Sequence, residues 1–259
     1  MDASTPRIPD LSGKAVLITG ASTGIGAALA RAFAEQGATV GLHYNSSQEA
    51  AEKLAAEIDA AGGKSVLLRA DATLSAEMTA MVEEFAQEAG RLDGLINNAG
   101  GMVARVPYAE MTDAHYDAVM DLNARSVLVA SAAAIPHLKK AGGFIINTTS
   151  IAARNGASNG AGIYGSSKAF VANVTRGMAK ELIPFGIRVN AVAPGVITTP
   201  FHERYSTKAQ LDAALATIPE GRLGTAEDCV GAYLFLASEA LSPYVIGQTL
   251  EINGGQLMP

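Results

Sequence analysis

Residues 15–26 read AVLITGASTGIG, an apolar run that leads directly into three closely spaced glycines. Glycine is needed where the backbone turns sharply or must approach a ligand without a Cβ atom in the way. The next stretch, Gly24–Gln36, predicts a helix, and the free N–H groups at a helix start favour an anion. Because the spacing is G-x-x-x-G-x-G and no Gly-Lys-Ser/Thr follows, a P-loop nucleotide site is disfavoured. A strand, a glycine loop and a helix in this order favour dinucleotide binding, with a plain turn as the alternative.

Apolar runs like this one recur along the chain and alternate with longer amphipathic stretches. The predicted strands are Ala15–Thr19, Thr39–His43, Ser65–Arg69, Leu92–Ile96, Phe144–Asn147, Arg188–Val192 and Gln248–Ile252. The predicted helices are Gly24–Gln36, Gln48–Ala61, Ser75–Ala89, Thr112–Lys139, Tyr164–Ile183 and Ala226–Ser238. Several strands are apolar at nearly every position, as is typical of parallel strands covered on both faces. The alternation predicts an α/β fold, a doubly wound parallel sheet with helices on both faces.

Residues 11–259 are expected to form a single domain, since no repeat or low-complexity linker interrupts the alternation. Residues 1–10 carry two prolines and two acidic residues but no apolar segment, so a short loose arm is expected there rather than a secretion signal. The longest irregular stretch, Pro194 to about Ser206, is polar and rich in proline. We expect it to belong to a lid near residues 196–222. In such sheets the ligand lies beyond the carboxyl ends of the strands.

Composition and charge exclude several classes of protein. With 49% hydrophobic and 17% charged residues, the chain is not disordered. Lys plus Arg (19) minus Asp plus Glu (25) gives a net charge of −6, without the basic run that a nucleic-acid or acidic-membrane partner requires. No apolar run approaches the ~20 residues that span a bilayer. The single cysteine, Cys229, excludes an intramolecular disulfide and favours a cytoplasmic setting. No metal site is predicted, because metal-ligand spacing is absent from the four histidines, His43, His115, His137 and His202.

Five motifs occur in order between about Lys14 and Gly255. They are TGASTGIG (19–26), NNAG (97–100), YGSSK (164–168), Pro194-Gly195 with Thr199, and Gly247-Gln248-Thr249 with Asn253-Gly254-Gly255. With these motifs the chain resembles the classical short-chain dehydrogenase/reductases over nearly its whole length. The resemblance implies a Rossmann-like domain that transfers a hydride between a nicotinamide cofactor and a carbonyl compound or secondary alcohol. Arg222–Glu227 and residues 247–249 look most like the 3-oxoacyl-carrier-protein reductase and sugar or polyol dehydrogenase branch.

A catalytic group is predicted around YGSSK. Tyr164 and Lys168 are four residues apart at a predicted helix start, so their side chains share one face. A nearby ammonium would lower the phenol pKa from its ordinary ~10 and let Tyr164 exchange a proton with a carbinol oxygen. Ser150 ends a strand and could hold the substrate oxygen. It lies 14 residues before Tyr164, one more than is usual in the family, and the glycine-rich loop between them is expected to absorb the difference. For Asn123 the resemblance implies a helix bulge and a water relay to Lys168, while an exposed polar residue is the alternative.

The resemblance also implies which residues surround the cofactor. They are Gly20, Ser22, Thr23, Gly24, Ile25, Gly26, Asn98, Ala99, Gly100, Tyr164, Lys168, Pro194, Gly195, Ile197 and Thr199. Asp71 and Ala72 follow the third predicted strand, where a carboxylate would accept from the adenine amino group. A cap or turn role for Asp71 is equally open.

The end of the second predicted strand predicts the choice of cofactor. No acid occurs between Glu35 and Glu49, so a ribose 2′-hydroxyl lacks its usual acidic partner. A 2′-phosphate could instead be surrounded by Tyr44, Asn45, Ser46 and Ser47. We therefore expect NADP(H) to be preferred, with NAD(H) still able to serve. The preference is expected to be modest, because Thr23 stands where many NADP-preferring relatives carry an arginine.

The substrate and partners are predicted less closely. A small carbonyl compound or alcohol is expected between Gly101–Pro107, Ser150–Gly162 and Pro200–Arg222, with a 3-oxoacyl thioester and a sugar or polyol as the two candidates. A basic rim for a carrier protein could come from Arg105, Arg154, Arg204 and Lys208, although an ordinary surface is favoured. A dinucleotide-sensing regulator with a dead site is the rival from another class. It predicts loss of Ser, Tyr, Lys or Asn, and all four can be assigned.

Assembly is predicted from apolar residues in excess of what one buried face needs. Thr112–Lys139 and Ser166–Leu182 mix small and apolar residues on more than one face. One face can cover the sheet, and the surplus requires another protein surface. Relatives commonly assemble through these helices, and a homotetramer is expected.

Overall fold

The apolar run after Lys14 forms an inner strand of a seven-stranded parallel sheet in the computed structural model, which describes residues 7–259. The strands lie in the order β3-β2-β1-β4-β5-β6-β7. Their bounds are β1 (Ala15–Ile18), β2 (Thr39–Tyr44), β3 (Lys64–Arg69), β4 (Gly94–Asn97), β5 (Gly143–Thr148), β6 (Ile187–Pro194) and β7 (Thr249–Ile252). All seven predicted strands are present, and the predicted doubly wound sheet is confirmed.

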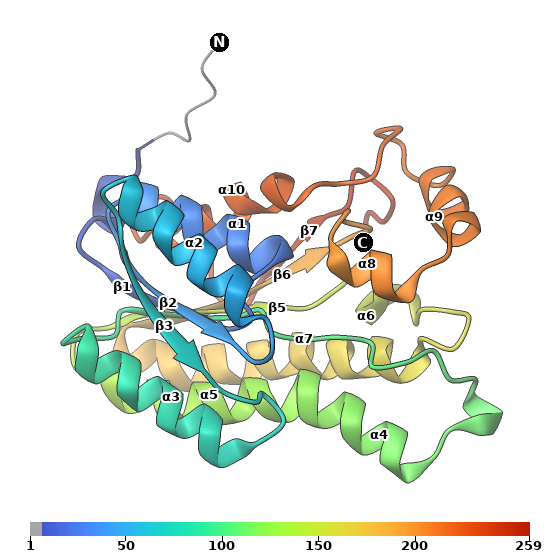
Figure 1. Ribbon diagram of the computed structural model, residues 1–259, viewed down its shortest axis with the longest axis horizontal. Helices are drawn as coiled ribbons and strands as arrows, with labels where there is room; N and C mark the ends of the chain where they lie inside the picture. The colour runs from blue at the N-terminus through green and yellow to red at the C-terminus, as the bar shows by residue number, and fades with distance from the viewer. Residues whose placement is uncertain (1–6) are drawn as a thin grey trace.

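Helices cover both faces of the sheet (Figure 1). The longer ones are α1 (Gly24–Glu35), α2 (Gln48–Ala60), α3 (Ser75–Glu88), α4 (Asp113–Met120), α5 (Ser126–Leu138), α7 (Gly162–Leu182) and α10 (Ala226–Ala237). One core layer lies between the sheet and α1, α2 and α10, and it contains Phe33 and Tyr233. The other lies between the sheet and α3, α5 and α7, and it contains Phe85 and Leu182. Strands β1 and β4 are neighbours at the point where the strand order reverses, which is where such folds bind ligands.

The predicted helix Thr112–Lys139 is present as one helical stretch made of α4, η3 and α5. The middle segment, η3 (Asp121–Arg125), is a five-residue π-helix that contains Asn123, so the helix bulge that the resemblance implied at this residue is present. Apolar periodicity alone does not reveal such a bulge. The stretch Asp113–Leu138 is long enough to cross a membrane and contains an 18-residue window with a mean hydropathy of 1.4. Its buried side chains, such as Ala130 and Leu138, belong to the second core layer, which accounts for that composition.

The region predicted to be an irregular lid contains two helices, α8 (Pro200–Tyr205) and α9 (Lys208–Leu215). Proline at the first position suits α8, since its missing N–H would be unpaired there anyway. Thr207 starts α9 with a capping box that includes Gln210. The predicted irregular stretch is therefore wrong from Pro200 onward.

The remaining differences from the predictions are local. A short helix, α6 (Ala152–Asn155), lies between Ser150 and Tyr164, and α7 begins two residues before Tyr164. Three 3₁₀ segments complete the chain, η1 (Pro9–Leu11), η2 (Tyr108–Glu110) and η4 (Ile183–Phe185). Of the arm expected at residues 1–10, residues 1–6 lie outside the described part. Asp10 is not loose, because its carboxylate accepts hydrogen bonds from Ser238 Oγ (2.8 Å) and Ala240 N (3.1 Å).

Candidate active site

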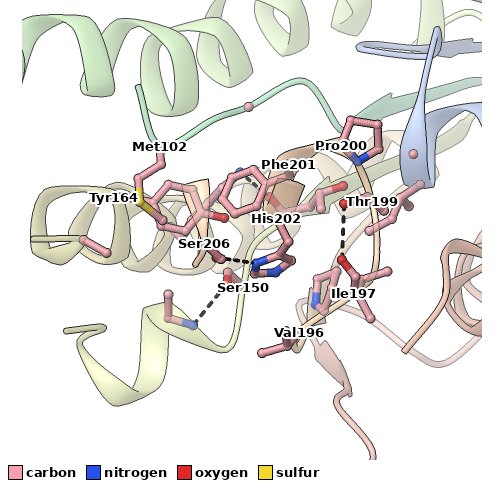
Figure 2. A pocket seen from close by; sticks show the side chains of 18 of the residues that line it. Met102, Ser150, Tyr164, Val196, Ile197, Thr199, Pro200, Phe201, His202 and Ser206 are labelled. Carbon is pink, nitrogen blue, oxygen red and sulfur yellow. Dashed lines mark hydrogen bonds between the residues drawn. The ribbon is translucent and has the colours of Figure 1, made fainter. Parts of the chain in front are cut away.

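The carboxyl ends of the central strands open into a cavity of about 790 Å³. The glycine loop and the end of β2 line one end of it, and α8 and α9 line the other. Figure 2 shows the second end, where Phe201, His202 and Ser206 lie close to Tyr164 and Ser150.

The glycine loop is shaped by positions that no larger residue could occupy. Gly20 and Gly24 have φ angles of +64° and +55°, in the left-handed region that L side chains rarely adopt. A Cβ atom on Gly20 would lie 2.9 Å from the Cα atom of Ala99. At Gly26 a Cβ atom would collide with the Gly20 carbonyl oxygen and lie 2.7 Å from Asn98 Nδ2. The backbone can therefore approach a phosphate, and the cradle fits the pyrophosphate of a dinucleotide.

Two side chains join this loop to the neighbouring strand. Thr19 Oγ1 accepts hydrogen bonds from the backbone N–H groups of Asn98 (2.9 Å) and Ala99 (3.0 Å). The side-chain amide of Asn98 donates in return to the carbonyl oxygens of Thr19 and Gly20, both at 3.0 Å. The predicted bracing by Asn98 is present. Thr19 was predicted as the last strand residue and the first residue of the glycine-loop motif, without a role in bracing.

His43 holds the loop from the other side. Its Nδ1 accepts from the Gly20 N–H (3.0 Å), and its Nε2 lies 3.0 Å from the Ala70 carbonyl oxygen. A carbonyl oxygen can only accept, so Nε2 carries the proton and the ring is neutral. Burial lowers the pKa of His43 below 6.5, although the bond to Ala70 and the charge of Asp71 act in the opposite direction.

The end of β2 carries the residues predicted to select the cofactor. The cavity is lined there by Tyr44, Asn45, Ser46 and Ser47, as well as by Ala72. Asp71 does not line it. The Asp71 carboxylate accepts from Thr73 N (2.9 Å) and Thr73 Oγ1 (2.7 Å), which lowers the Asp71 pKa. The structure thus favours the turn role for Asp71 over the predicted adenine contact.

Tyr164, Ser150 and Lys168 line the cavity together. Ser150 Oγ accepts from the Ala152 N–H (3.1 Å), and its hydroxyl also forms a hydrogen bond with Tyr164, so the two hydroxyls lie together in the cavity. Lys168 Nζ lies 5.9 Å from the centre of the Tyr164 ring and donates to the Thr148 carbonyl oxygen (3.0 Å). A second bond, from Thr149 Oγ1 to the Lys168 carbonyl oxygen (2.7 Å), joins the first turns of α7 to the end of β5.

The two titratable groups shift in the directions that burial dictates. Burial raises the pKa of Tyr164 to about 12, and a hydrogen bond with Ser150 acts in the opposite direction. Burial lowers the pKa of Lys168 to about 8. The lowered Tyr164 pKa expected from its lysine neighbour is not found. Desolvation of the phenolate raises this pKa by more than the hydrogen bond with Ser150 lowers it. Tyr164 is therefore a protonated phenol near neutral pH.

Asn123 lies in the π-helix and is fully buried, so the alternative of an exposed polar residue is wrong. Its Oδ1 accepts from the Gly101 N–H (3.0 Å), and its Nδ2 donates to the carbonyl oxygens of Gly101 (2.8 Å) and Val119 (2.9 Å). A Cβ atom on Gly100 would lie 2.7 Å from Asn123 Oδ1 and 3.0 Å from Lys168 Nζ. Because Gly100 has no side chain, the side chains of both Asn123 and Lys168 can pack closely against its backbone.

An aromatic cluster from α8 covers the substrate end. The ring centres of Tyr164 and Phe201 are 5.6 Å apart, and those of Phe201 and His202 are 5.1 Å apart. His202 Nδ1 lies 2.9 Å from Ser206 Oγ (Figure 2). Burial lowers the pKa of His202, and the charge of Arg105 adds to that effect.

Most residues predicted for the site line the cavity, and three do not. Gly26, Asp71 and Asn123 are not among the residues that line the cavity. The substrate end is also lined by residues that were not singled out as cavity residues from the sequence, among them Met102, Arg105, Asn155, Phe201, His202 and Leu211. All six lie within the three segments that were predicted to contact the substrate. Within residues 7–259, no three His, Cys, Asp or Glu side chains gather in a group that could hold a metal ion.

Comparison with known sequences covers almost the whole chain. A family model described as enoyl-(acyl carrier protein) reductase matches residues 20–256. A 3-oxoacyl-[acyl-carrier-protein] reductase of Thermotoga maritima is 39% identical over 246 residues, which are 95% of this chain and 98% of that protein.

Solved structures of similar proteins carry both nicotinamide cofactors. The NADH-dependent reductase A1-R′, complexed with NAD, has a TM-score of 0.87 at 41% identity and covers 97% of this chain and 99% of its own. A short-chain dehydrogenase of Burkholderia cenocepacia, in complex with NADP, has a TM-score of 0.89 at 34% identity, with coverage of 95% and 99%. The same fold therefore holds NAD in one relative and NADP in another.

Proposed function

Since the chain belongs to the short-chain dehydrogenase/reductase family and is an oxidoreductase that binds NAD or NADP, we propose that it transfers a hydride between NADP(H) and a small carbonyl compound or secondary alcohol. The observation that carries this proposal is one cavity that joins the glycine cradle to Tyr164, Ser150 and Lys168.

Tyr164 exchanges the proton in this proposal. The nicotinamide ring supplies or accepts the hydride at the substrate carbon. In the reductive direction, the Tyr164 hydroxyl donates its proton to the carbonyl oxygen as that oxygen becomes a hydroxyl. A phenol whose pKa burial raises to about 12 is protonated at neutral pH, which is the form that this step requires.

Ser150, Lys168 and Asn123 support that step. The Ser150 hydroxyl, held by the bond from the Ala152 N–H, donates its proton to the same substrate oxygen. The Lys168 ammonium stabilises negative charge on Tyr164 after the proton has left, and at pH 7 it remains mostly charged because its pKa is about 8. Asn123 holds Gly101 and so positions the loop beside Lys168.

The preference for NADP(H) is supported by the charges around the nucleotide end. Among residues 7–259, no Asp or Glu side chain lines the cavity, so no lining carboxylate opposes a 2′-phosphate. Ser46 and Ser47 are exposed at the end of β2, where their hydroxyls can donate to phosphate oxygens. No arginine of the described chain lines this end, and a modest preference follows.

Two substrate classes are proposed for the first test. A 3-oxoacyl thioester is supported by the name of the Thermotoga maritima relative, and a sugar or polyol is the alternative. The basic rim suggested for a carrier protein finds little support, because Arg154 pairs with Glu251 (2.9 Å) and Lys208 with Asp212 (2.6 Å).

The deciding experiment is a panel of acetoacetyl thioesters, ketoses, polyols and diketones, each with NADPH and NADH or with the oxidised cofactors. Turnover is read from the absorbance of the reduced cofactor, and binding from its fluorescence, which no tryptophan of this chain obscures. We expect turnover of at least one class, faster with NADP(H). Tight binding of NADPH without turnover of any class would favour the dinucleotide-sensing regulator.

We also propose a cytoplasmic homotetramer. Leu128 on α5 and Phe170 on α7 remain 39% and 37% exposed, which supports a further protein surface on these helices. Light scattering at micromolar protein should give the mass of four chains, whereas a monomer would refute the assembly. Cell fractionation tests the location.

A further inference from the structure

Arg105 extends from the loop after β4 into the substrate end of the cavity. Its Nε donates to the Tyr205 carbonyl oxygen (2.7 Å), and its Nη1 donates to the carbonyl oxygens of Ser158 (3.3 Å) and Asn159 (3.2 Å). These bonds orient the guanidinium plane. They leave Nη2 without an acceptor among residues 7–259.

No negative charge in the described chain balances this guanidinium. Arg105 forms no ion pair there, and neither Asp nor Glu contributes to the cavity lining. The side chain is half-buried, and burial lowers the pKa of the guanidinium with no acid acting in the opposite direction. Arginine remains charged in proteins, so a partly desolvated cation faces the cavity without a counter-ion.

His202 contributes a second unused donor to the lining of the same cavity. Nδ1 of His202 lies 2.9 Å from Ser206 Oγ, and no residue of the described chain bonds to Nε2. The charge of Arg105 reaches this ring, because it helps to keep His202 neutral. When the Ser206 hydroxyl donates to Nδ1, the Nε2–H group can donate to a ligand.

Given the proposed hydride transfer, we propose that Arg105 Nη2 and His202 Nε2 bind an anionic oxygen group of the substrate, a carboxylate or a phosphate. An arginine fork is the side chain best suited to such groups, and its charge-assisted bonds are strong where water is partly excluded. The substrate class is therefore an anionic carbonyl compound, or the corresponding hydroxy compound.

The anion lies away from the reacting carbonyl. The Phe201 ring stands between the other two, 5.6 Å from Tyr164 and 5.1 Å from His202 by ring centres. A carbonyl oxygen at Tyr164 and Ser150 thus requires a spacer before the anion can reach His202. Phe201, Met102 and Leu211 line the cavity and give that spacer apolar neighbours.

A purely structural role for Arg105 has to be separated from this one. Its bonds join three segments that include strained positions, with φ angles of 64° at Val103, 54° at Ala157 and 53° at Asn159. Val106 N also donates to the Gly160 carbonyl oxygen (2.8 Å). An Arg105 variant that only loosened these loops would slow charged and neutral substrates alike. The decisive quantity is therefore a ratio between them.

The test compares each anionic substrate with a neutral partner. One arm uses oxo acids with one to four methylenes between carbonyl and carboxylate, each beside its primary amide. The other uses acetoacetyl coenzyme A beside acetoacetyl N-acetylcysteamine. In one of the two arms, the wild type should favour the anionic substrate over its neutral partner by roughly 10- to 100-fold in kcat/KM. The arm that shows this preference identifies the bound group as a carboxylate or as a phosphate. Arg105→Gln should abolish that preference through KM, and Arg105→Lys should restore part of it.

Two further variants serve as controls. Arg204→Gln removes a positive charge from the lid, outside the cavity lining, and should leave the ratio unchanged. His202→Asn removes the Nε2 donor and should reduce the preference by a smaller factor. Equal loss of charged and neutral turnover in Arg105→Gln, or no preference in either arm, would overturn the proposal.

Failure of the proposed function gives a different result. If no carbonyl compound is turned over at all, calorimetry with glutarate and with glutaramide still decides the anion site. Saturable binding of glutarate to the wild type, absent for glutaramide and for Arg105→Gln, supports the site independently of catalysis. Absence of glutarate binding to the wild type would then refute it.

Discussion

The two ends of the cavity are held in place by different kinds of contact. At the nucleotide end, Thr19, Asn98 and His43 bond the glycine loop to the ends of neighbouring strands. At the substrate end, residues 101–107, 150–162 and 196–222 meet through the Arg105 guanidinium and the rings of α8. The first set of bonds is anchored in the sheet, while the second joins surface segments far apart in the sequence.

This difference explains why one end can be shared among relatives that bind NAD or NADP. Backbone groups and glycines make the nucleotide cradle, so it needs only that the strands keep their register. The substrate end depends on individual side chains of three loops, and changing one of them changes what fits. Four substitutions test the roles of the two ends separately, and they follow in order of expected effect.

Tyr164→Phe should lower kcat by about 100-fold or more and leave NADPH binding unchanged, because only the proton-transfer hydroxyl is lost. Stopped-flow turnover and fluorescence titration measure the two effects. Tyr205→Phe, on the lid but outside the cavity lining, is the matched control and should retain activity. Retention of more than about a tenth of kcat in Tyr164→Phe would remove Tyr164 from its proposed role.

Gly26→Ala should have the opposite profile and weaken NADPH binding by about tenfold or more. The new methyl group would collide with the Gly20 carbonyl oxygen and press on Asn98, and overpacking of this kind costs about 1–3 kcal/mol. Fluorescence titration gives the Kd. Gly177→Ala in α7 has no atom within 4 Å of the added Cβ and should bind NADPH normally. Normal binding by Gly26→Ala would show that the cradle is not close-packed.

Ser46→Asp should move the kcat/KM preference toward NAD(H) by about tenfold, which corresponds to about 1.4 kcal/mol. The new carboxylate would accept from a ribose 2′-hydroxyl and repel a 2′-phosphate. Ser46→Asn, which adds a similar volume without charge, should shift the preference much less. An unchanged ratio with Ser46→Asp would place the 2′ position elsewhere.

Acid should weaken the nucleotide end through His43. The bond from the Gly20 N–H requires an unprotonated Nδ1, and burial holds the pKa of His43 below 6.5 in the folded protein. The unfolded chain therefore takes up this proton first, so the stabilisation is complete above about pH 6.5 and is lost as pH falls through the lower folded pKa. Tm and NADPH affinity should both decline between pH 7 and pH 5.

The variant His43→Gln should show a smaller decline in Tm over this range, with each kcal/mol worth about 2–4 °C in a chain of this size. His115, which lies outside the cavity lining, provides the control, and His115→Gln should keep the wild-type pH dependence. An identical pH profile in His43→Gln and the wild type would assign the acid sensitivity to other groups.

Much of the fold could be predicted because its signals are local. The run AVLI and the glycines after it are adjacent in the chain, and β1 begins at the predicted residue. Tyr164 and Lys168 could be paired from their spacing, since four residues make about one helical turn. The π-helical bulge at Asn123 was implied by the family resemblance but could not be derived from periodicity. A π-helix of five residues leaves the apolar pattern on both sides almost unchanged.

The sequence by itself determined which elements carry the chemistry, namely a glycine cradle after β1 and a Tyr-Lys pair on α7. Both features depend only on residues within one helical turn or one strand of each other. Only the tertiary structure decided that Asp71 turns toward Thr73, that burial raises the Tyr164 pKa, and that Arg105 faces the cavity with an unused N–H group. These properties depend on desolvation and on contacts such as the 100-residue separation between Arg105 and Tyr205. Neither quantity exists until the chain has brought distant segments together.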